Sequence, residues 1–241
     1  MAFRSLARDL TASFACGLRR AASGPRSILA GAIITLLCSI TLMVPARPAE
    51  AHPHAWIDVA VRVAFDKDGN AVGLHQVWLF DELYTAFAMD GLAKKGAQPA
   101  QTDIDALMHR NMTNLADFSY FTQVKHDGAA VALRKVTEMS SKLTGARLSM
   151  SFYLPFKTAI DPREKPLQYA VYDPTYFIEV LHAKADDAVQ LAGAPANCAH
   201  DLIEPTPSME AVLLAQSLDR TQSAGDGLGV LFAQTVEIRC R

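Results

Sequence analysis

The stretch from residue 55 to residue 81, AWIDVAVRVAFDKDGNAVGLHQVWLFD, decides the fold that the sequence predicts. Its first eleven residues alternate strictly, and the apolar ones share one face: Ile57, Val59, Val61, Val63 and Phe65. A period of two indicates a β-strand with one buried face. Residues 66–70, DKDGN, are types that tolerate left-handed backbone and therefore predict a turn. Residues 71–81 return as a second strand, so the stretch predicts a β-hairpin.

Two helices are predicted directly after this hairpin. Over residues 81–96, apolar residues recur near helical spacing, and Lys94-Lys95-Gly96 is a helix stop signal. The second helix lies within residues 102–121, where Thr102 precedes Asp105 by three residues and resembles a capping box. Its apolar residues follow at steps of three and four: Ile104, Leu107, Met108, Met112 and Leu115.

The remainder of the chain is predicted to be mainly strands. Strand patterns cover 119–131, 131–145, 146–156 and 167–182, the last interrupted by Pro174 as at a bulge or sheet edge. We expect 193–208 to be irregular, 209–218 to be helical, and 230–240 to be a strand or a short helix passing into one. Together these elements predict an α+β fold: a mostly antiparallel sheet or sandwich with a two-helix insertion.

The residues before the hairpin have the pattern of a secretory signal peptide. Five arginines and one aspartate lie within residues 1–26, an uncharged apolar run fills 27–44, and the small-residue triplet Ala49-Glu50-Ala51 follows. We therefore predict a signal peptide over 1–51, cut after Ala51, and a single periplasmic α+β domain over 52–241. The alternative is an uncleaved membrane anchor, since about 18 apolar residues is near the length that spans a bilayer.

Charge and cysteine content both narrow the function of the domain. The leader holds six of the 23 Lys and Arg residues and two of the 25 Asp and Glu residues, so the domain has 17 basic and 23 acidic residues and a formal charge of −6. This charge argues against nucleic acid as a partner.

After cleavage only the cysteines Cys198 and Cys240 remain. In an oxidising compartment they predict one disulfide across a loop of about 40 residues, worth about 3–4 kcal/mol. A two-cysteine metal site is the alternative, without a CxxC spacing to support it.

The common catalytic motifs are absent from the sequence, which directs attention to seven histidines: His52, His54, His75, His109, His126, His182 and His200. A cut after Ala51 gives His52 a free α-amine, which can coordinate a metal near neutral pH together with its own imidazole. His54 adds a third nitrogen, in a set that suits copper, nickel or zinc. Pro53 has no amide hydrogen, so the amino-terminal copper site that uses deprotonated backbone amides is excluded. The alternative is that both histidines are simply solvated.

Further ligands would have to come from the folded domain. His75 lies on the second hairpin strand, where it can face the first, and Asp58 lies on the first strand. Asp81 stands where a strand passes into a helix, and an N-cap is the alternative role for it. Asp173 precedes a proline in YDPTY, where a simple turn is the alternative.

Several of these motifs together resemble a known family. His-Pro-His after a leader, AWIDV, VWLFDE, YDPTYF and the closing LGVLFAQTVEIRC are similar, in the same order, to an uncharacterised family of exported bacterial proteins. That family is often labelled a periplasmic component of an ABC-type transport system, and its genes are commonly found beside nickel/cobalt-type permeases and among zinc-responsive genes. The resemblance extends to residues at its motif positions: His52, Pro53, His54, Asp81, Glu82, Asp173, Tyr176, Cys198 and Cys240.

We therefore expect a binding protein rather than an enzyme. Our first hypothesis is a periplasmic accessory protein that binds zinc, nickel, cobalt or copper through His52 and His54, with His75, Asp58, Asp81 or Asp173 completing the site. Its partner would be a membrane permease of the nickel/cobalt or ABC type. The alternatives are a non-catalytic assembly protein that docks on a membrane transport system without a metal, and a copper enzyme that uses an amino-terminal histidine brace.

Overall fold

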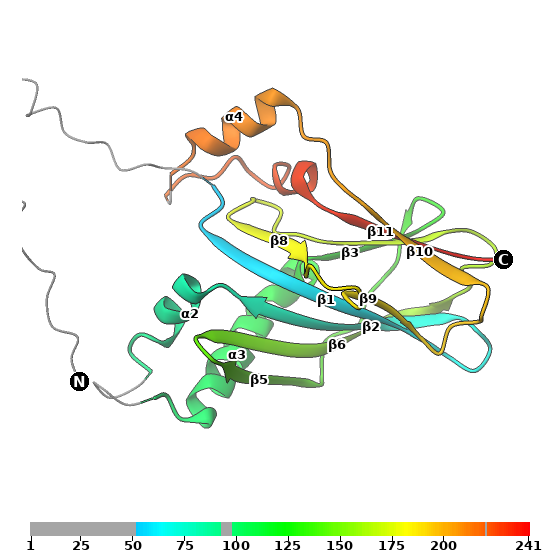
Figure 1. The fold of residues 1–241 in the computed structure, drawn as a ribbon, viewed down its shortest axis with the longest axis horizontal. Helices are drawn as coiled ribbons and strands as arrows, with labels where there is room; N and C mark the ends of the chain where they lie inside the picture. Colours follow the sequence, from blue (N-terminus) through cyan, green and yellow to red (C-terminus); the bar gives the residue numbers. More distant parts are fainter. Residues whose placement is uncertain (1–51, 93–97, 220) are drawn as a thin grey trace, which may run out of the picture. The chain divides into compact units, whose positions relative to one another are not determined.

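The domain has an α+β fold with two mostly antiparallel sheets (Figure 1). The computed structural model describes residues 52–92, 98–219 and 221–241, which all belong to one compact unit, Ala49–Arg241. The predicted signal peptide over 1–51 lies outside these residues. Within them the structure contains three α-helices, and none is long and apolar enough to cross a membrane.

The predicted hairpin forms the centre of the larger sheet. Strands β1 (Ala55–Phe65) and β2 (Ala71–Phe80) are antiparallel, with Ile57 opposite Phe80 and Arg62 opposite His75. The strand order is β5-β6-β2-β1-β8, with β9 also paired to β1. The outer strands are β5 (Met139–Thr144), β6 (Arg147–Ile160), β8 (Ile178–His182) and β9 (Val189–Ala192). Both β8 and β9 run parallel to β1, and these are the exceptions to the antiparallel pattern.

The smaller sheet has the order β10-β11-β7-β3-β4. Its strands are β3 (Thr122–His126), β4 (Ala129–Ala130), β7 (Leu167–Val171), β10 (Cys198–Ile203) and β11 (Thr235–Cys240). The sequence left β10 unrecognised, because the stretch 193–208 carries three prolines and its strand is exposed along almost its whole length. The register of β10 on β11 places Cys198 opposite Cys240, and the predicted disulfide joins them.

The predicted strand over 167–182 is in fact two strands in different sheets. Strand β7 ends at Val171 in the smaller sheet, and β8 begins at Ile178 in the larger one. The turn between them contains Asp173 and Pro174, so the proline marks a change of sheet rather than a bulge.

Three helices complete the fold. Helix α2 (Glu82–Met89) is capped by the Asp81 side chain and ends before the predicted stop at 94–96, which lies outside the described residues. Helix α3 (Gln101–Leu115), followed by η1 (Ala116–Phe121), has no side-chain cap. The predicted capping box is therefore wrong: Ala100 is the N-cap and Thr102 already lies in the first turn. Helix α4 (Met209–Ser217) precedes η2 (Gly229–Phe232), which leads into β11.

The main core lies between the two sheets and α3. It contains the β1 residues Ile57, Val59, Val61 and Val63 and the α3 residues Ile104, Met108 and Met112, all at most 2% exposed. A short chain of buried hydrogen bonds crosses it: Trp78 Nε1 donates to Gln76 Oε1, and Gln76 Nε2 donates to Thr122 Oγ1. Because buried polar groups need partners, this chain fixes the position of β2 relative to β3.

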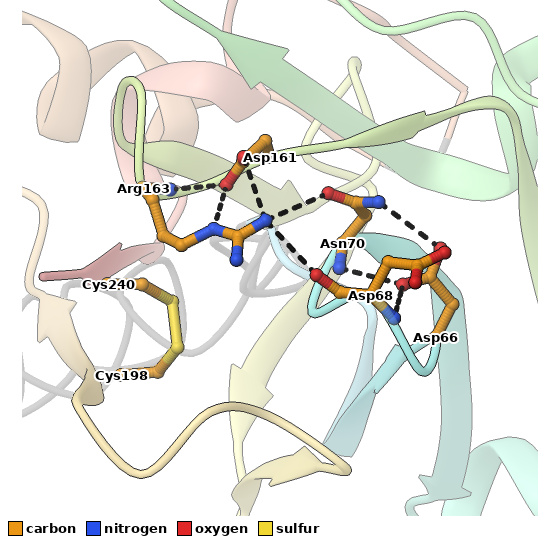
Figure 2. A network of polar contacts seen from close by, with 7 residues as sticks. All are labelled: Asp66, Asp68, Asn70, Asp161, Arg163, Cys198 and Cys240. Carbon is orange, nitrogen blue, oxygen red and sulfur yellow. Dashed lines mark hydrogen bonds and ion pairs between the residues drawn. A yellow bond between two sulfur atoms is a disulfide. The ribbon is translucent and has the colours of Figure 1, made fainter.

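Charged contacts fasten the hairpin turn to the turn that follows β6 (Figure 2). The Arg163 guanidinium bonds the Asp161 carboxylate, the Asp68 carbonyl at 3.1 Å and Asn70 Oδ1 at 3.4 Å. The Asp66 carboxylate accepts the backbone N–H groups of Asp68 and Asn70. The Arg163 guanidinium therefore ties the two turns together through hydrogen bonds.

Candidate functional site

The segment that carries His52 and His54 is held between helix α4 and the start of β8. The His52 backbone N–H donates to the Ala215 carbonyl of α4 at 3.1 Å, and the His54 N–H donates to the Phe177 carbonyl at 2.9 Å. Strand β1 starts immediately after, with Ala55 opposite Ile178. Backbone hydrogen bonds to α4 on one side and to Phe177 on the other therefore hold His52 and His54 in place.

The two imidazole rings lie against each other and against one aromatic ring. The centroids of His52 and His54 are 4.8 Å apart with their planes at 73°, and the centroid of Phe177 lies 5.6 and 5.1 Å from them. His52 is only 5% exposed. Among the described residues, neither of its ring nitrogens has a hydrogen-bond partner. A buried polar group without a hydrogen-bond partner costs about 1–3 kcal/mol of stability. A ligand that binds the His52 ring nitrogens would remove this cost.

A small second core next to the pair supports this arrangement. It comprises Tyr176, Ala215, Leu218 and Leu228, with the Phe232 ring stacked on Tyr176 at 4.0 Å. The Tyr176 hydroxyl donates to Glu179 Oε1 at 3.0 Å, and burial raises the pKa of that hydroxyl strongly, with the nearby Glu179 charge adding to the effect. This cluster holds α4 over the histidine segment.

The charge of His54 has a small effect on one carboxylate, Asp219. Asp219 follows the end of α4, and its pKa is lowered mainly by hydrogen bonds from Thr221, with a smaller contribution from His54. Its Oδ1 accepts the N–H and the hydroxyl of Thr221. The sequence did not single out Asp219, because only the fold brings the end of α4 to the start of β1.

The predicted carboxylate ligands have structural partners elsewhere. Asp81 Oδ1 accepts the Tyr84 N–H as a helix cap, and its Oδ2 accepts the Trp56 N–H. Asp58 forms an ion pair with Arg147 at 2.6 Å. These contacts agree with the alternative role of Asp81 as an N-cap.

Asp173, the third predicted carboxylate, is occupied in the same way. Its Oδ1 accepts the N–H and hydroxyl of Thr175, and its Oδ2 accepts the Ile178 N–H at 3.0 Å. Asp173 is 5% exposed, and its carboxylate organises the turn between β7 and β8.

His75 lies far from the histidine pair. It is opposite Arg62 on β1, eight residues beyond His54, which is about 26 Å at about 3.3 Å per residue. Its ring stacks on Tyr153 at 4.3 Å, and burial and the Arg62 charge lower its pKa. Of the six predicted ligands, the structure brings together His52 and His54. Across the ranges it describes, there is no group of three or more His, Cys, Asp or Glu residues arranged to hold a metal ion.

Sequence reasoning missed one residue beside the pair, Phe177, and His182, one of the seven histidines, has a structural role. Phe177 forms the aromatic wall of the histidine pair, and its only signal was its place beside Tyr176 in YDPTYF. His182 is buried in a chain that runs from the Tyr169 hydroxyl to His182 Nε2, and from His182 Nδ1 to Gln234 Oε1. Gln234 Nε2 in turn donates to Glu204. Both His182 nitrogens are thus engaged, and the residue is structural.

Comparisons with known proteins identify the family. A family model described as "Protein of unknown function (DUF1007)" matches residues 37–240. The chain is also 28% identical over 192 residues to an uncharacterised protein of Haemophilus influenzae, and this match covers 79% of the chain and 91% of that protein. Because the family model matches most of its length, the chain belongs to the DUF1007 family of proteins of unknown function.

Proposed function

We propose that this protein is an exported accessory protein that binds a transition-metal ion through His52 and His54 in support of a membrane permease of the nickel/cobalt or ABC type. One observation carries the proposal. His52 is buried beside a second imidazole, and neither of its ring nitrogens has a hydrogen-bond partner among the residues that the structure describes. A metal ion bound by the imidazoles satisfies such a nitrogen without requiring another protein group.

The chemistry of the pair supports a borderline transition metal. Imidazole nitrogens suit zinc, nickel, cobalt and copper better than magnesium or calcium. Two imidazoles that bind one ion at about 2.0–2.1 Å place their ring centroids about 5 Å apart. The 4.8 Å separation of His52 and His54 agrees with this spacing.

The protein ligands at the pair are few and leave coordination positions open, which suits cargo handling better than a structural site. Structural zinc sites are closed by four protein ligands, whereas open positions let an ion enter and leave. After a cut at Ala51, the α-amine of His52 would join the two imidazoles. Its hydrogen can still reach the Ala215 carbonyl, because an amine donates a hydrogen and coordinates through its lone pair. Asp219 is a carboxylate whose pKa the His54 charge helps to lower.

The cellular location is supported by independent features. The Cys198–Cys240 disulfide is typical of an oxidising compartment. A basic stretch, an apolar run and a small-residue triplet precede His52. Both suit a periplasmic protein that meets metal ions before a permease does.

Metal titration of the exported protein tests the proposal. We expect the protein, stripped of metal, to bind about one equivalent of Zn²⁺, Ni²⁺, Co²⁺ or Cu²⁺ in calorimetry. The double variant His52→Ala/His54→Ala is expected to weaken binding at least about 100-fold, by loss of both imidazoles. His75→Ala is the matched control, since that histidine lies on another part of the sheet, and it is expected to bind like the wild type.

Absence of metal uptake by correctly processed wild-type protein would contradict the proposal, as would uptake that the double variant retains. The intact mass of the exported protein shows where the leader is cut. A mass that begins at His52 permits the α-amine as a third nitrogen ligand, whereas a different start leaves the two imidazoles as the nitrogen donors.

A second candidate function is assembly without a metal. The observation that favours it is a set of exposed apolar side chains on α2 and α4, which suits a docking role. In that case the double histidine variant would support transport as well as the wild type does, and variants of the exposed apolar residues would not.

A further inference from the structure

A small pocket lies between helices α2 and α3 and the inward face of the larger sheet. Its volume is about 190 Å³. The sheet contributes four lining residues that are at most 4% exposed: Ile57, Trp78, Phe80 and Met150. All four belong to the main core, so the floor of the pocket is formed by core side chains. We call this space the core pocket.

The walls of the core pocket are aromatic and uncharged. The ring centroids of Phe121 and Trp78 are 6.2 Å apart with nearly parallel planes. The Tyr84 ring of α2 stacks on Phe80 at 4.9 Å. Among the described residues that line the pocket, none is acidic, basic or a histidine. The Trp78 indole N–H already donates to Gln76 Oε1. The floor therefore offers few of the two to four polar partners that an ordered water needs.

Two amide side chains border the core pocket on the side of α3. Asn111, Asn114 and Leu115 line it, and their spacing of three and four residues places them on one face of the helix. Within the described chain, neither asparagine side chain makes a hydrogen bond. Asn114 is exposed, whereas Asn111 and Leu115 are half-buried, so the amides lie where the pocket meets solvent. An amide group can donate and accept hydrogen bonds.

The volume and the lining of the core pocket together define the class of its ligand. An apolar cavity of about 150 Å³ stays dry and accepts a benzene molecule, so a volume of about 190 Å³ holds one six-membered ring with a small substituent. A carboxylate or an ammonium group would lose its hydration in the pocket without meeting an opposite charge there. The ligand is therefore expected to be neutral.

We propose that the core pocket binds a neutral single-ring molecule that carries one hydrogen-bonding group. The ring packs against Trp78 and Phe80, and the hydroxyl or carbonyl group of the ligand bonds to the amide of Asn111 or Asn114. Pockets that bind small molecules usually have this composition, an apolar and aromatic lining with a few polar groups that fix the orientation of the ligand.

This proposal is independent of the metal site. Ile178 lines the core pocket, whereas the ring of Phe177, its neighbour in the chain, contacts the histidine pair. The pocket contains no histidine and needs no ion. Ligand binding is therefore measured in the presence of a chelator, where the metal site plays no part.

Titration of the exported, processed protein with phenol tests the proposal. The two tryptophan indole resonances of ¹⁵N-labelled protein, from Trp56 and Trp78, are followed by NMR. We expect the Trp78 resonance to shift with a Kd on the order of 0.1–1 mM. The Trp56 side chain, 43% exposed and outside the pocket, should shift much less. Benzoate has the same ring with a negative charge and is expected to bind at least about ten-fold more weakly than phenol.

Variants of α3 locate the binding site. Leu115→Phe places a larger side chain in the core pocket and is expected to lower phenol affinity at least about five-fold. Leu107→Phe is the matched control, because Leu107 is also half-buried on α3 but does not line the pocket. Asn111→Leu/Asn114→Leu removes both amides and is expected to lower phenol affinity about two- to ten-fold, with benzene binding kept within about two-fold of the wild type. Circular dichroism checks that each variant folds.

Four results would overturn the proposal. The first is that millimolar phenol leaves the Trp78 resonance unchanged, and the second is that Leu107→Phe and Leu115→Phe weaken binding equally. The third is that benzoate binds as tightly as phenol, which indicates a charged site elsewhere on the protein. The fourth is that the double asparagine variant binds phenol like the wild type, because the amides would then make no bond to the ligand.

Discussion

At the scale of single residues, the unusual feature is a histidine that the fold buries without satisfying it. His52 is 5% exposed, packs edge-on against His54 and Phe177, and has no hydrogen-bond partner for its ring nitrogens in the described chain. His182 is buried to a similar degree, yet both of its nitrogens are bonded. Residues selected for stability alone resemble His182. A residue that keeps an unsatisfied nitrogen at a cost in stability resembles a ligand.

The substitution His52→Leu separates the two roles. Leucine keeps apolar contact with Phe177 and removes the unsatisfied nitrogens, so the metal-free variant should be as stable as the wild type or about 1–2 kcal/mol more stable. Urea unfolding in the presence of a chelator measures this. A loss of more than about 2 kcal/mol would mean that the ring is a structural group, contrary to the account.

His182 makes the free energy of unfolding depend on pH, because the fold buries this histidine with its ring nitrogens bonded. Burial is the largest cause of its lowered pKa, and the hydrogen bond with Gln234 opposes it. Below the unfolded value of about 6.5 the unfolded chain therefore binds more protons than the folded one. The stabilisation is complete above this pH and is lost as the pH falls through the folded pKa.

We expect the free energy of unfolding to fall between about pH 7 and about pH 5, and His182→Gln to remove part of that fall. His75→Gln is the control, because His75 is less buried and should contribute less to the slope. Urea unfolding at several pH values provides the measurement. An equal slope in wild type and His182→Gln would show that another group controls the dependence.

At the scale of elements, sequence patterns succeeded where one face of a strand is buried. The alternation of β1 and the DKDGN turn predict the hairpin correctly. The failures have local causes. Strand β10 is exposed along almost its whole length and so has no alternation of burial, and the change of sheet between β7 and β8 depends on tertiary packing around Asp173.

A close backbone approach holds η2 and α4 in place over the histidine segment. The Gly229 N–H donates to the Pro174 carbonyl at 2.9 Å, and a Cβ at Gly229 would lie 1.8 Å from the Asp173 carbonyl oxygen. We expect Gly229→Ala to destabilise the protein by about 1–3 kcal/mol or more, because the backbone must move. Gly227→Ala, where a Cβ would meet no atom within 4 Å, should be nearly neutral.

Thermal unfolding of these two variants tests the role of Gly229. Hydrogen exchange adds a local measurement, since displacement of η2 should increase exchange in α4 more than in β1. Equal stability of Gly229→Ala and Gly227→Ala would show that the approach of the two segments is not required.

At the scale of the whole molecule, the sequence predicts the α+β class, the hairpin and the disulfide, because each depends on local pattern or simple counting. It predicts the two histidines of the candidate site but not their surroundings. His75 and the three aspartates were plausible ligands by residue type, yet the fold gives each of them another position or another partner. Phe177 comes to the pair from the turn before β8, and α4 bonds the His52 segment through the Ala215 carbonyl, so these contacts are a property of the topology.

The location of a bound metal tests the central claim most directly. Crystals of the exported protein with one equivalent of zinc, measured at the zinc absorption edge, should show one anomalous peak about 2.0–2.1 Å from a ring nitrogen of His52 and of His54. A peak at His75 or elsewhere, with His52 and His54 unbound in correctly processed protein, would contradict the account.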